Sequence, residues 1–177
     1  MFTKRGLSLV ELLVAVGIMA ILAVGLVSYY GRYQHRTRYI RTKNELRQIN
    51  AALEHWISDN ETYPADVNRG LPTGLEAYLP DGDWPSGPWN NSVYDWDSWL
   101  INNDPVYQIS LRFCDINDDE AVCQQKIPPI LPTFDKYSAI YYCVEGECQS
   151  HNSKPADYPG LCINCNQNEE DVLWGGN

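Results

Sequence analysis

The sequence predicts an α+β protein in which a long N-terminal helix, transmembrane in its first half, packs by its second half against a small antiparallel sheet with a disulfide-stapled C-terminal region. Three observations predict this fold class. An apolar run opens the chain, a helical stripe continues without a proline as far as Pro64, and all six cysteines lie after residue 113. With 177 residues, 44% of them apolar, the chain suits one globular domain with an appendage.

The apolar run covers residues 7–30, and Glu11 is its only charged residue. A helix of this length rises about 36 Å at about 1.5 Å per residue, whereas the hydrocarbon core of a bilayer is about 30 Å thick. We therefore predict a transmembrane helix here. A cleaved secretory signal ending at the small residues 23–25 is the alternative. Glu11 disfavours that alternative, because a lone carboxylate in lipid costs about 2.5–3.5 kcal/mol.

The string KRGLSLVELLVAVGIMAIL, residues 4–22, resembles the leader and first helix of type IV pilins and type II secretion pseudopilins. The resemblance implies that a prepilin peptidase cleaves after Gly6 and methylates the new N-terminal amine, that of Leu7. It also implies that Glu11 pairs with the N-terminal amine of a neighbouring subunit during assembly. The family more often has Phe or Met where Leu7 stands, and many members carry a helix proline that this sequence lacks.

The same resemblance predicts the organisation and the location of the chain. Residues 1–6 are the leader, 7–30 the transmembrane and assembly half of the helix, 31–60 its amphipathic half and 61–177 the globular head. The protein is expected to cross the inner membrane once, with its N-terminus cytoplasmic and its head extracytoplasmic, and then to join a cell-surface filament. Its expected partners are other pilin subunits, prepilin peptidase, the inner-membrane assembly machinery and, before assembly, membrane lipid.

Charge is distributed unevenly along the chain. Residues 1–47 contain eight Lys and Arg against two acids, whereas residues 48–177 contain five against 21. An acidic head argues against nucleic acid as a partner, since phosphate binding depends on basic residues. We interpret the basic residues of 32–47 as a solvated or intersubunit face rather than a DNA-binding strip. Counted alone, they would place this flank in the cytoplasm, but the family orientation and the cysteines predict the opposite.

Apolar residues at helical spacing extend the helix to about residue 58, with its end at residues 59–60. They are Tyr39, Leu46, Ile49, Leu53 and Trp56. Residues 61–105 contain six prolines, which predicts a long structured loop or a few short elements, with a short helix over 71–78. Within this segment, residues 84–99 resemble the Pro-Trp-Asn segment of type II secretion major pseudopilins. We expect their tryptophans to pack on the core rather than to form a ligand platform.

Two strands are expected after this segment. Residues 106–113 alternate apolar and polar side chains, which predicts a half-buried strand, and residues 137–144 predict a second one. If Glu145 and Gly146 form a two-residue hairpin turn, Cys148 lies opposite Cys143, within disulfide range.

Six cysteines favour disulfides in an oxidising compartment. The simplest of the fifteen possible connectivities pairs neighbours, namely Cys114–Cys123, Cys143–Cys148 and Cys162–Cys165. The last four cysteines also have the spacing C-x4-C-x13-C-x2-C, which is compatible with a zinc site. A membrane-anchored extracytoplasmic metal or redox module is therefore an alternative function of another class.

The acidic segment that begins at Asp115 imitates the start of a calcium loop, with oxygen ligands at Asp115, Asn117 and Asp119. Glu120 stands where that loop needs glycine, and Lys126 stands where it needs a bidentate glutamate. Major pseudopilins bind calcium in their heads, so we keep a calcium site as a hypothesis, but we expect no cofactor and interpret the segment as an acidic turn closed by Cys114 and Cys123.

The sequence contains no recognisable catalytic constellation. Its histidines, His35, His55 and His151, have no spacing that suggests a nucleophile and a base. We therefore expect a protein that is not an enzyme but a structural subunit, a pilin or minor pilin of a type IV pilus. A pseudopilin of a type II secretion system is the alternative within the same family.

Overall fold

The computed structural model describes residues 8–101, 103–115, 117–131, 134–145, 148 and 160–164. The elements in chain order are α1 (Leu9–Asn60), the 3-10 helix η1 (Leu75–Tyr78), β1 (Val93–Ile101), β2 (Asp104–Arg112), α2 (Glu120–Lys126), β3 (Ala139–Glu145) and β4 (Leu161–Cys162). The chain divides into two compact units, Met1–Thr37 and Arg38–Asn177, and α1 contributes to both of them.

The first unit consists, in its described part, of the N-terminal portion of α1. Eleven large apolar side chains between Leu9 and Val24 are each more than half exposed in the single chain. This portion of α1 contains no proline, and its glycines, Gly17, Gly25 and Gly31, are well separated, so the backbone continues as a helix. The membrane span predicted over 7–30 is not confirmed, since no helix among the described residues is both long and apolar enough to cross a bilayer.

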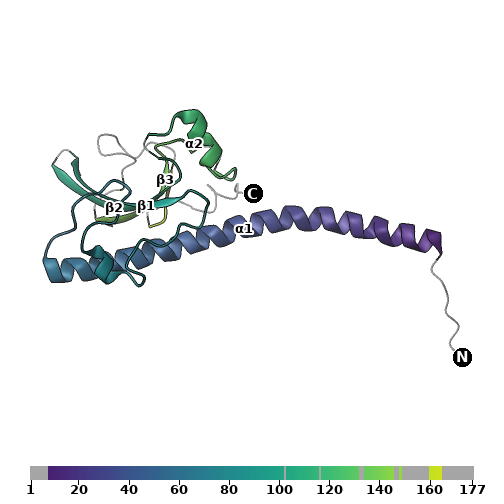
Figure 1. Cartoon of the computed structure of the whole chain (residues 1–177), viewed down its shortest axis with the longest axis horizontal. Coiled ribbons are helices and arrows are strands. Elements are labelled where there is room, and N and C mark those ends of the chain that lie inside the picture. The colour runs from purple at the N-terminus through teal and green to yellow at the C-terminus, as the bar shows by residue number, and fades with distance from the viewer. Residues whose placement is uncertain are drawn as a thin grey trace, which may run out of the picture. The chain divides into compact units, whose positions relative to one another are not determined.

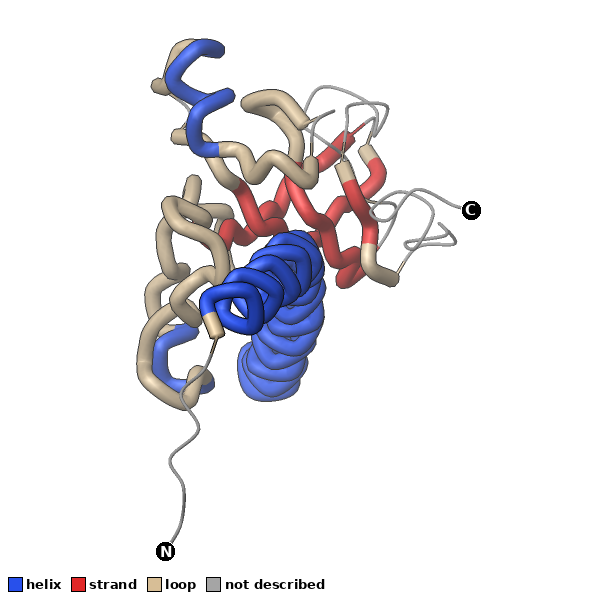
Figure 2. The backbone as a smooth tube through the Cα atoms, turned by 90° about the vertical axis from the view of Figure 1, so that its right-hand side faces the viewer, coloured by secondary structure: helices blue, strands red, loops and turns tan. Residues whose placement is uncertain are grey.

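In the second unit, the remainder of α1 lies alongside the sheet (Figures 1 and 2). Leu46, Ile49 and Leu53 are fully buried and recur every third or fourth residue, which confirms the predicted amphipathic stripe. The helix ends at Asn60, as expected, because Glu61 adopts φ 61°. The Glu61 backbone amide donates to the carbonyl of Ile57 at 2.8 Å, and this bond closes the helix with a left-handed cap.

A polar link holds this part of α1 to β1. The Tyr94 hydroxyl donates to Glu45 Oε2 at 2.5 Å, and Arg41 Nε lies 2.6 Å from Glu45 Oε1. Burial and the adjacent Glu45 carboxylate both raise the pKa of Tyr94, so its hydroxyl remains a donor at all ordinary pH values. Arg41 also donates to the backbone carbonyl of Ser86 at 2.8 Å, which ties the proline-rich segment to the helix.

The sheet has the order β1-β2-β3-β4. β1 and β2 pair antiparallel, with Trp96 opposite Ile109, and β2 and β3 also pair antiparallel. β4 pairs parallel to β3, with Tyr141 opposite Cys162. The sheet is therefore mixed: the predicted antiparallel pairing holds for β1, β2 and β3, and β4 adds a parallel pair that was not predicted. A strand of two residues has no measurable periodicity, so the sequence does not indicate its direction. Parallel strands need a crossover connection, and the segment between β3 and β4 is long enough for one.

β1 lies in the segment that we expected to be a loop or short elements. Its sequence alternates aromatic and acidic residues, and both sets are buried: Tyr94 and Trp96 in the core with α1, Asp95 and Asp97 on the opposite face. Acidic residues are rare in strands and favour loops, so single-sequence reasoning misses this strand. Trp96 is completely buried, which confirms the expectation of core packing for this tryptophan.

β2 is buried on both faces, so the prediction of a half-buried strand is wrong. Its polar residues Gln108, Ser110 and Arg112 have exposures of 0%, 0% and 7%. They lie against the two acids of β1 through a network of hydrogen bonds and ion pairs. Its shortest contacts are Arg112 Nε to Asp95 Oδ2 at 2.9 Å, Gln108 Nε2 to Asp97 Oδ2 at 2.9 Å, Arg112 Nη2 to Asp97 Oδ2 at 3.2 Å and Ser110 Oγ to Asp97 Oδ2 at 3.2 Å.

Burial raises the pKa of Asp97 from 3.8 to about 6, against the opposing attraction of Arg112 and with further help from the neighbouring Asp95 carboxylate. A carboxyl whose folded pKa exceeds its unfolded value stabilises the fold at low pH, and this contribution is lost as the pH rises through about 6. The relevant window therefore runs from about pH 4 to about pH 6.

We expect the free energy of unfolding to decrease by up to about 3 kcal/mol across that window, because a shift of one pKa unit corresponds to about 1.4 kcal/mol. Asp97→Asn should flatten this decrease, since an amide does not titrate. Urea unfolding of both proteins at several pH values measures the two slopes. Equal slopes would show that Asp97 does not carry the pH dependence.

Candidate functional site at the N-terminal end of the long helix

The described chain begins at Ser8, immediately before the first turn of α1. The Ser8 backbone amide donates to Glu11 Oε2 at 2.8 Å, and the Glu11 amide donates to Ser8 Oγ at 3.2 Å. These reciprocal bonds form a capping box, in which two side chains satisfy two of the backbone N–H groups that a helix N-terminus leaves without partners. The Glu11 carboxylate therefore has a bonding partner within its own chain.

The position of Glu11 is also favourable electrostatically. A carboxylate in the first turn faces the positive end of the helix dipole, which stabilises its charge. The sequence contains the signal for this arrangement, a serine followed three residues later by a glutamate just before an apolar run. We expected Glu11 to need a charge from another subunit, and the capping role of Ser8 was not predicted.

The surroundings of Glu11 are apolar and exposed in the single chain. Leu12, Leu13 and Val14 are each more than half exposed, and an added Cβ at Gly17 would meet nothing within 4 Å. This part of α1 therefore presents an apolar surface with one carboxylate near its start. Gly6 and Leu7, the predicted processing residues, lie outside the described residues.

Comparison with known families decides what this end of the chain is. Residues 1–27 match the family described as the prokaryotic N-terminal methylation motif. The chain carries a prepilin-type signal. The matched segment contains Gly6, Leu7, Ser8 and Glu11, so the resemblance inferred from the sequence is confirmed for this segment.

The prepilin-type signal supports a pilin-like or pseudopilin-like substrate of prepilin peptidase that assembles with other subunits. It also implies a membrane-anchored protein that becomes part of a filament, and it favours a structural role. The comparisons with curated proteins and with solved structures each found no match.

Disulfides stabilise the head at two of the predicted positions. Cys114 is bonded to Cys123 and Cys143 to Cys148, with Cα separations of 5.2 and 5.3 Å. The first bond ties the end of β2 to α2, and both of its cysteines are buried. Cys162 is disulfide-bonded as well, but Cys165, its predicted partner, lies outside the described residues.

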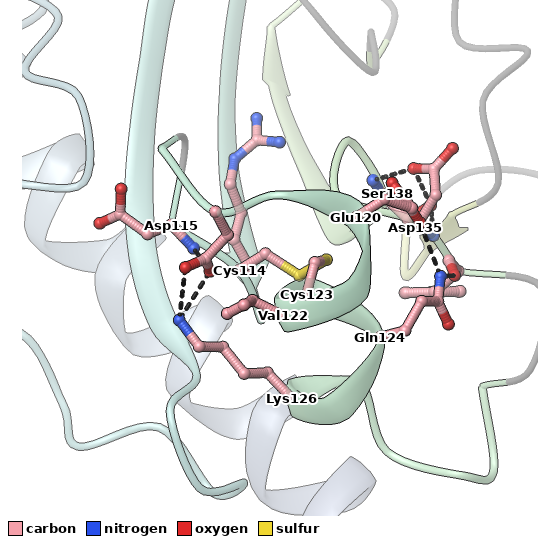
Figure 3. The surroundings of a disulfide bond; sticks show 12 residues. Cys114, Asp115, Glu120, Val122, Cys123, Gln124, Lys126, Asp135 and Ser138 are labelled. Carbon is pink, nitrogen blue, oxygen red and sulfur yellow. Dashed lines mark hydrogen bonds and ion pairs between the residues drawn. A yellow bond between two sulfur atoms is a disulfide. The ribbon is translucent and has the colours of Figure 1, made fainter.

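The candidate calcium loop lies between the two cysteines of the first disulfide (Figure 3). Its oxygens accept local hydrogen bonds: Asp115 Oδ1 from the Asn117 amide at 2.9 Å, and Asp119 Oδ1 from the Val122 amide at 2.8 Å, which caps α2. Calcium binding remains a prediction.

A cation of the chain itself also lies at this loop. Lys126 Nζ lies 2.6 and 2.8 Å from the two oxygens of Asp118, at the dashed lines beside Lys126 in Figure 3. This hydrogen bond holds the pKa of Asp118 below its usual value. Asp118 is not among the predicted calcium ligands, but the Lys126 ammonium would repel a cation held by the neighbouring oxygens.

We therefore expect Lys126→Met to strengthen any calcium binding at this loop by about tenfold, because it removes a positive charge beside the predicted ligands. Lys136→Met is the matched control, since Lys136 lies over the Tyr137 ring rather than in the acidic loop. Calorimetric titration with calcium measures the affinities. Equal affinities of wild type and Lys126→Met would contradict this role of the lysine.

Proposed function

We propose that this protein is a structural subunit, a pilin or minor pilin, of a type IV pilus. The observation that carries the proposal is the match of residues 1–27 to the methylation motif, because this segment contains Gly6, Leu7 and Glu11, to which the family resemblance assigns cleavage, methylation and assembly. In this proposal prepilin peptidase cleaves after Gly6, and the mature chain begins with N-methylated Leu7.

The exposed apolar surface of α1 supports an assembly role. Eleven large apolar side chains between Leu9 and Val24 are more than half exposed, and such an area is rarely left in contact with water. We propose that lipid covers this surface before assembly and that the helices of other subunits cover it in the filament. The inner-membrane assembly machinery would transfer the subunit from one environment to the other.

Glu11 is proposed to pair with the N-terminal amine of a neighbouring subunit. When water is excluded around the helix, an opposite charge stabilises the carboxylate more than the single Ser8 backbone amide does. The capping box means that this pairing adds to, or replaces, bonds that the isolated subunit already makes within its own chain. Assembly then depends on the difference in free energy between the Glu11 carboxylate bonded within its own chain and the same carboxylate paired with another subunit's amine.

Processing is tested by coexpression of the full chain with a prepilin peptidase, followed by N-terminal sequencing and intact mass measurement. We expect the wild type to begin at N-methylated Leu7, and Gly6→Val to keep its leader. Gly17→Val is the matched control, because an added side chain there meets nothing within 4 Å, and it should be processed like the wild type. A mature chain that begins at any other residue would overturn the proposal.

A pseudopilin of a type II secretion system is the second candidate, favoured by the resemblance of residues 84–99 to major pseudopilins. Deletion of the gene separates the two functions. Loss of surface filaments that are labelled by antibodies to the head supports the pilin, whereas loss of protein secretion with intact surface filaments supports the pseudopilin.

A further inference from the structure

Three cysteine sulfur atoms lie together where β3 and β4 meet. The Sγ atoms of Cys143, Cys148 and Cys162 all lie within 4.8 Å of one another. Cys162 Sγ is 3.6 Å from Cys143 Sγ and 3.8 Å from Cys148 Sγ. Within the part of the chain that the structure describes, this is the one group of three or more His, Cys, Asp or Glu residues that is close enough to hold a metal ion.

The backbone around this cluster holds the two strands together independently of the sulfur atoms. The Ile163 amide donates to the Tyr141 carbonyl at 2.9 Å, next to the parallel pair of Tyr141 and Cys162. The Asn164 side chain accepts from the Cys143 amide at 2.8 Å and donates to the Cys143 carbonyl at 2.6 Å. These bonds place Cys143 and Cys162 side by side without a sulfur–sulfur bond between them, whereas Cys148 is linked to Cys143 by the disulfide.

The separations between the sulfur atoms match those of a zinc thiolate centre. Zinc binds cysteine sulfur at about 2.3 Å in a tetrahedron, which places the sulfur atoms about 3.8 Å apart. The two non-bonded separations here are 3.6 and 3.8 Å. The third, between Cys143 and Cys148, is a disulfide bond, and its reduction would let those two atoms separate. Cys148 and Cys162 are also 8% and 4% exposed, so the centre is largely shielded from water.

We propose that Cys143, Cys148 and Cys162 form a thiolate site for Zn²⁺ in the reduced chain, and that disulfide formation closes this site when an exchanging disulfide of a thiol oxidant accepts two electrons and two protons for each bond formed. A dithiol or phosphine reductant supplies two electrons to each disulfide, and two protons from water complete the two thiols. The three thiols of the cluster then release three protons to solvent as zinc binds, and water or another ligand takes the fourth position. Sulfur ligands favour zinc over hard cations such as calcium and magnesium.

Such a site would act before the head is oxidised. Zinc would hold Cys143 of β3 next to Cys162 of β4 and would keep three of the six cysteines from incorrect pairing. Metal binding and disulfide bonding use the same sulfur atoms, so the two states exclude each other. This inference is independent of the proposed function, because it rests on the head and not on the N-terminal signal.

The test uses the full chain in mild detergent, oxidised or reduced with a phosphine. Co²⁺ replaces zinc as the probe, since thiolate ligands give it a charge-transfer absorption band, and Zn²⁺ is then added to displace it. We expect one Co²⁺ per chain and full displacement by Zn²⁺ in the reduced protein, with no band in the oxidised protein. A reduced wild type without the band would overturn the proposal.

Two variants locate the site within the reduced protein. Cys162→Ser removes one of the three ligands and should weaken zinc binding at least about a hundredfold in competition with a chelator. The double variant Cys114→Ser, Cys123→Ser removes the two sulfur atoms of the disulfide that is not part of the cluster. It should bind zinc as the wild type does. Tryptophan fluorescence of each oxidised variant confirms that the head is folded. Equal affinity in wild type and Cys162→Ser, or equal loss in both variants, would overturn the proposal.

Discussion

Arg112→Met is expected to destabilise the head by about 3–5 kcal/mol, the effect of removing one partner of a buried ion pair. The Arg112 side chain is 9% exposed and lies 2.9 Å from Asp95 Oδ2 and 3.2 Å from Asp97 Oδ2. Without the guanidinium, two carboxylates on adjacent positions of one strand face would remain buried with no cation between them. Because a small domain is stable by about 5–15 kcal/mol, this loss removes a large part of its stability.

Urea unfolding followed by tryptophan fluorescence, on the full chain in mild detergent, measures the effect. Arg47→Met is the matched control: the same substitution at an exposed position of α1 should change the free energy of unfolding by less than about 0.5 kcal/mol. The triple variant with Asp95→Asn, Asp97→Asn and Arg112→Met should recover part of the loss, since all three charges leave together. Similar stabilities of Arg112→Met and Arg47→Met would show that the ion pairs contribute little.

Glu11→Gln is expected to reduce filament yield by at least about tenfold while processing at Gly6 continues. Glutamine still offers an oxygen to the Ser8 amide, so the capping bond can persist, but the charge that another subunit's amine would meet is lost. An unpaired charge in an apolar surrounding costs about 2.5–3.5 kcal/mol, and without Glu11 the amine of the other subunit would bear this cost. A cost of about 1.4 kcal/mol corresponds to one factor of ten. Quantitative immunoblotting of sheared filaments against total processed subunit measures the yield.

Ser8→Ala separates the two roles of Glu11. This variant removes the hydroxyl that accepts the hydrogen bond from the Glu11 amide and should weaken the first helical turn by about 0.5–2 kcal/mol. It keeps the charge of the Glu11 carboxylate. We expect its filament yield to stay within about twofold of the wild type. If Ser8→Ala lowers the yield as much as Glu11→Gln does, then helix capping, and not pairing between subunits, is what assembly requires.

Several features of the fold were predictable from the sequence because they depend on local patterns. The stripe that contains Leu46, Ile49 and Leu53 has the helical period, and the helix end at Asn60 precedes an extended Tyr-Pro pair. Two disulfides joined cysteines close in sequence, whose short loops restrict the choice of partner. The prepilin-type signal is a contiguous string, so it is recognisable without any structure.

Other features depended on contacts between distant residues and were not predictable in this way. Asp95 and Asp97 suggested a loop when considered alone, but Arg112, about fifteen residues later in the chain, makes their burial possible by meeting both carboxylates in the sheet. The parallel pairing of β4 and the approach of Cys162 to Cys143 depend on a strand of two residues that carries no pattern of its own.

The sequence by itself determined the N-terminal signal and the long amphipathic helix, because both are written in neighbouring residues and in a single period. The tertiary structure alone decided which polar groups are buried, which strand direction closes the sheet and which sulfur atoms meet. The physical reason is that a buried charge or a buried thiol is acceptable only where its partner lies, and the folded chain brings that partner from a distant part of the sequence.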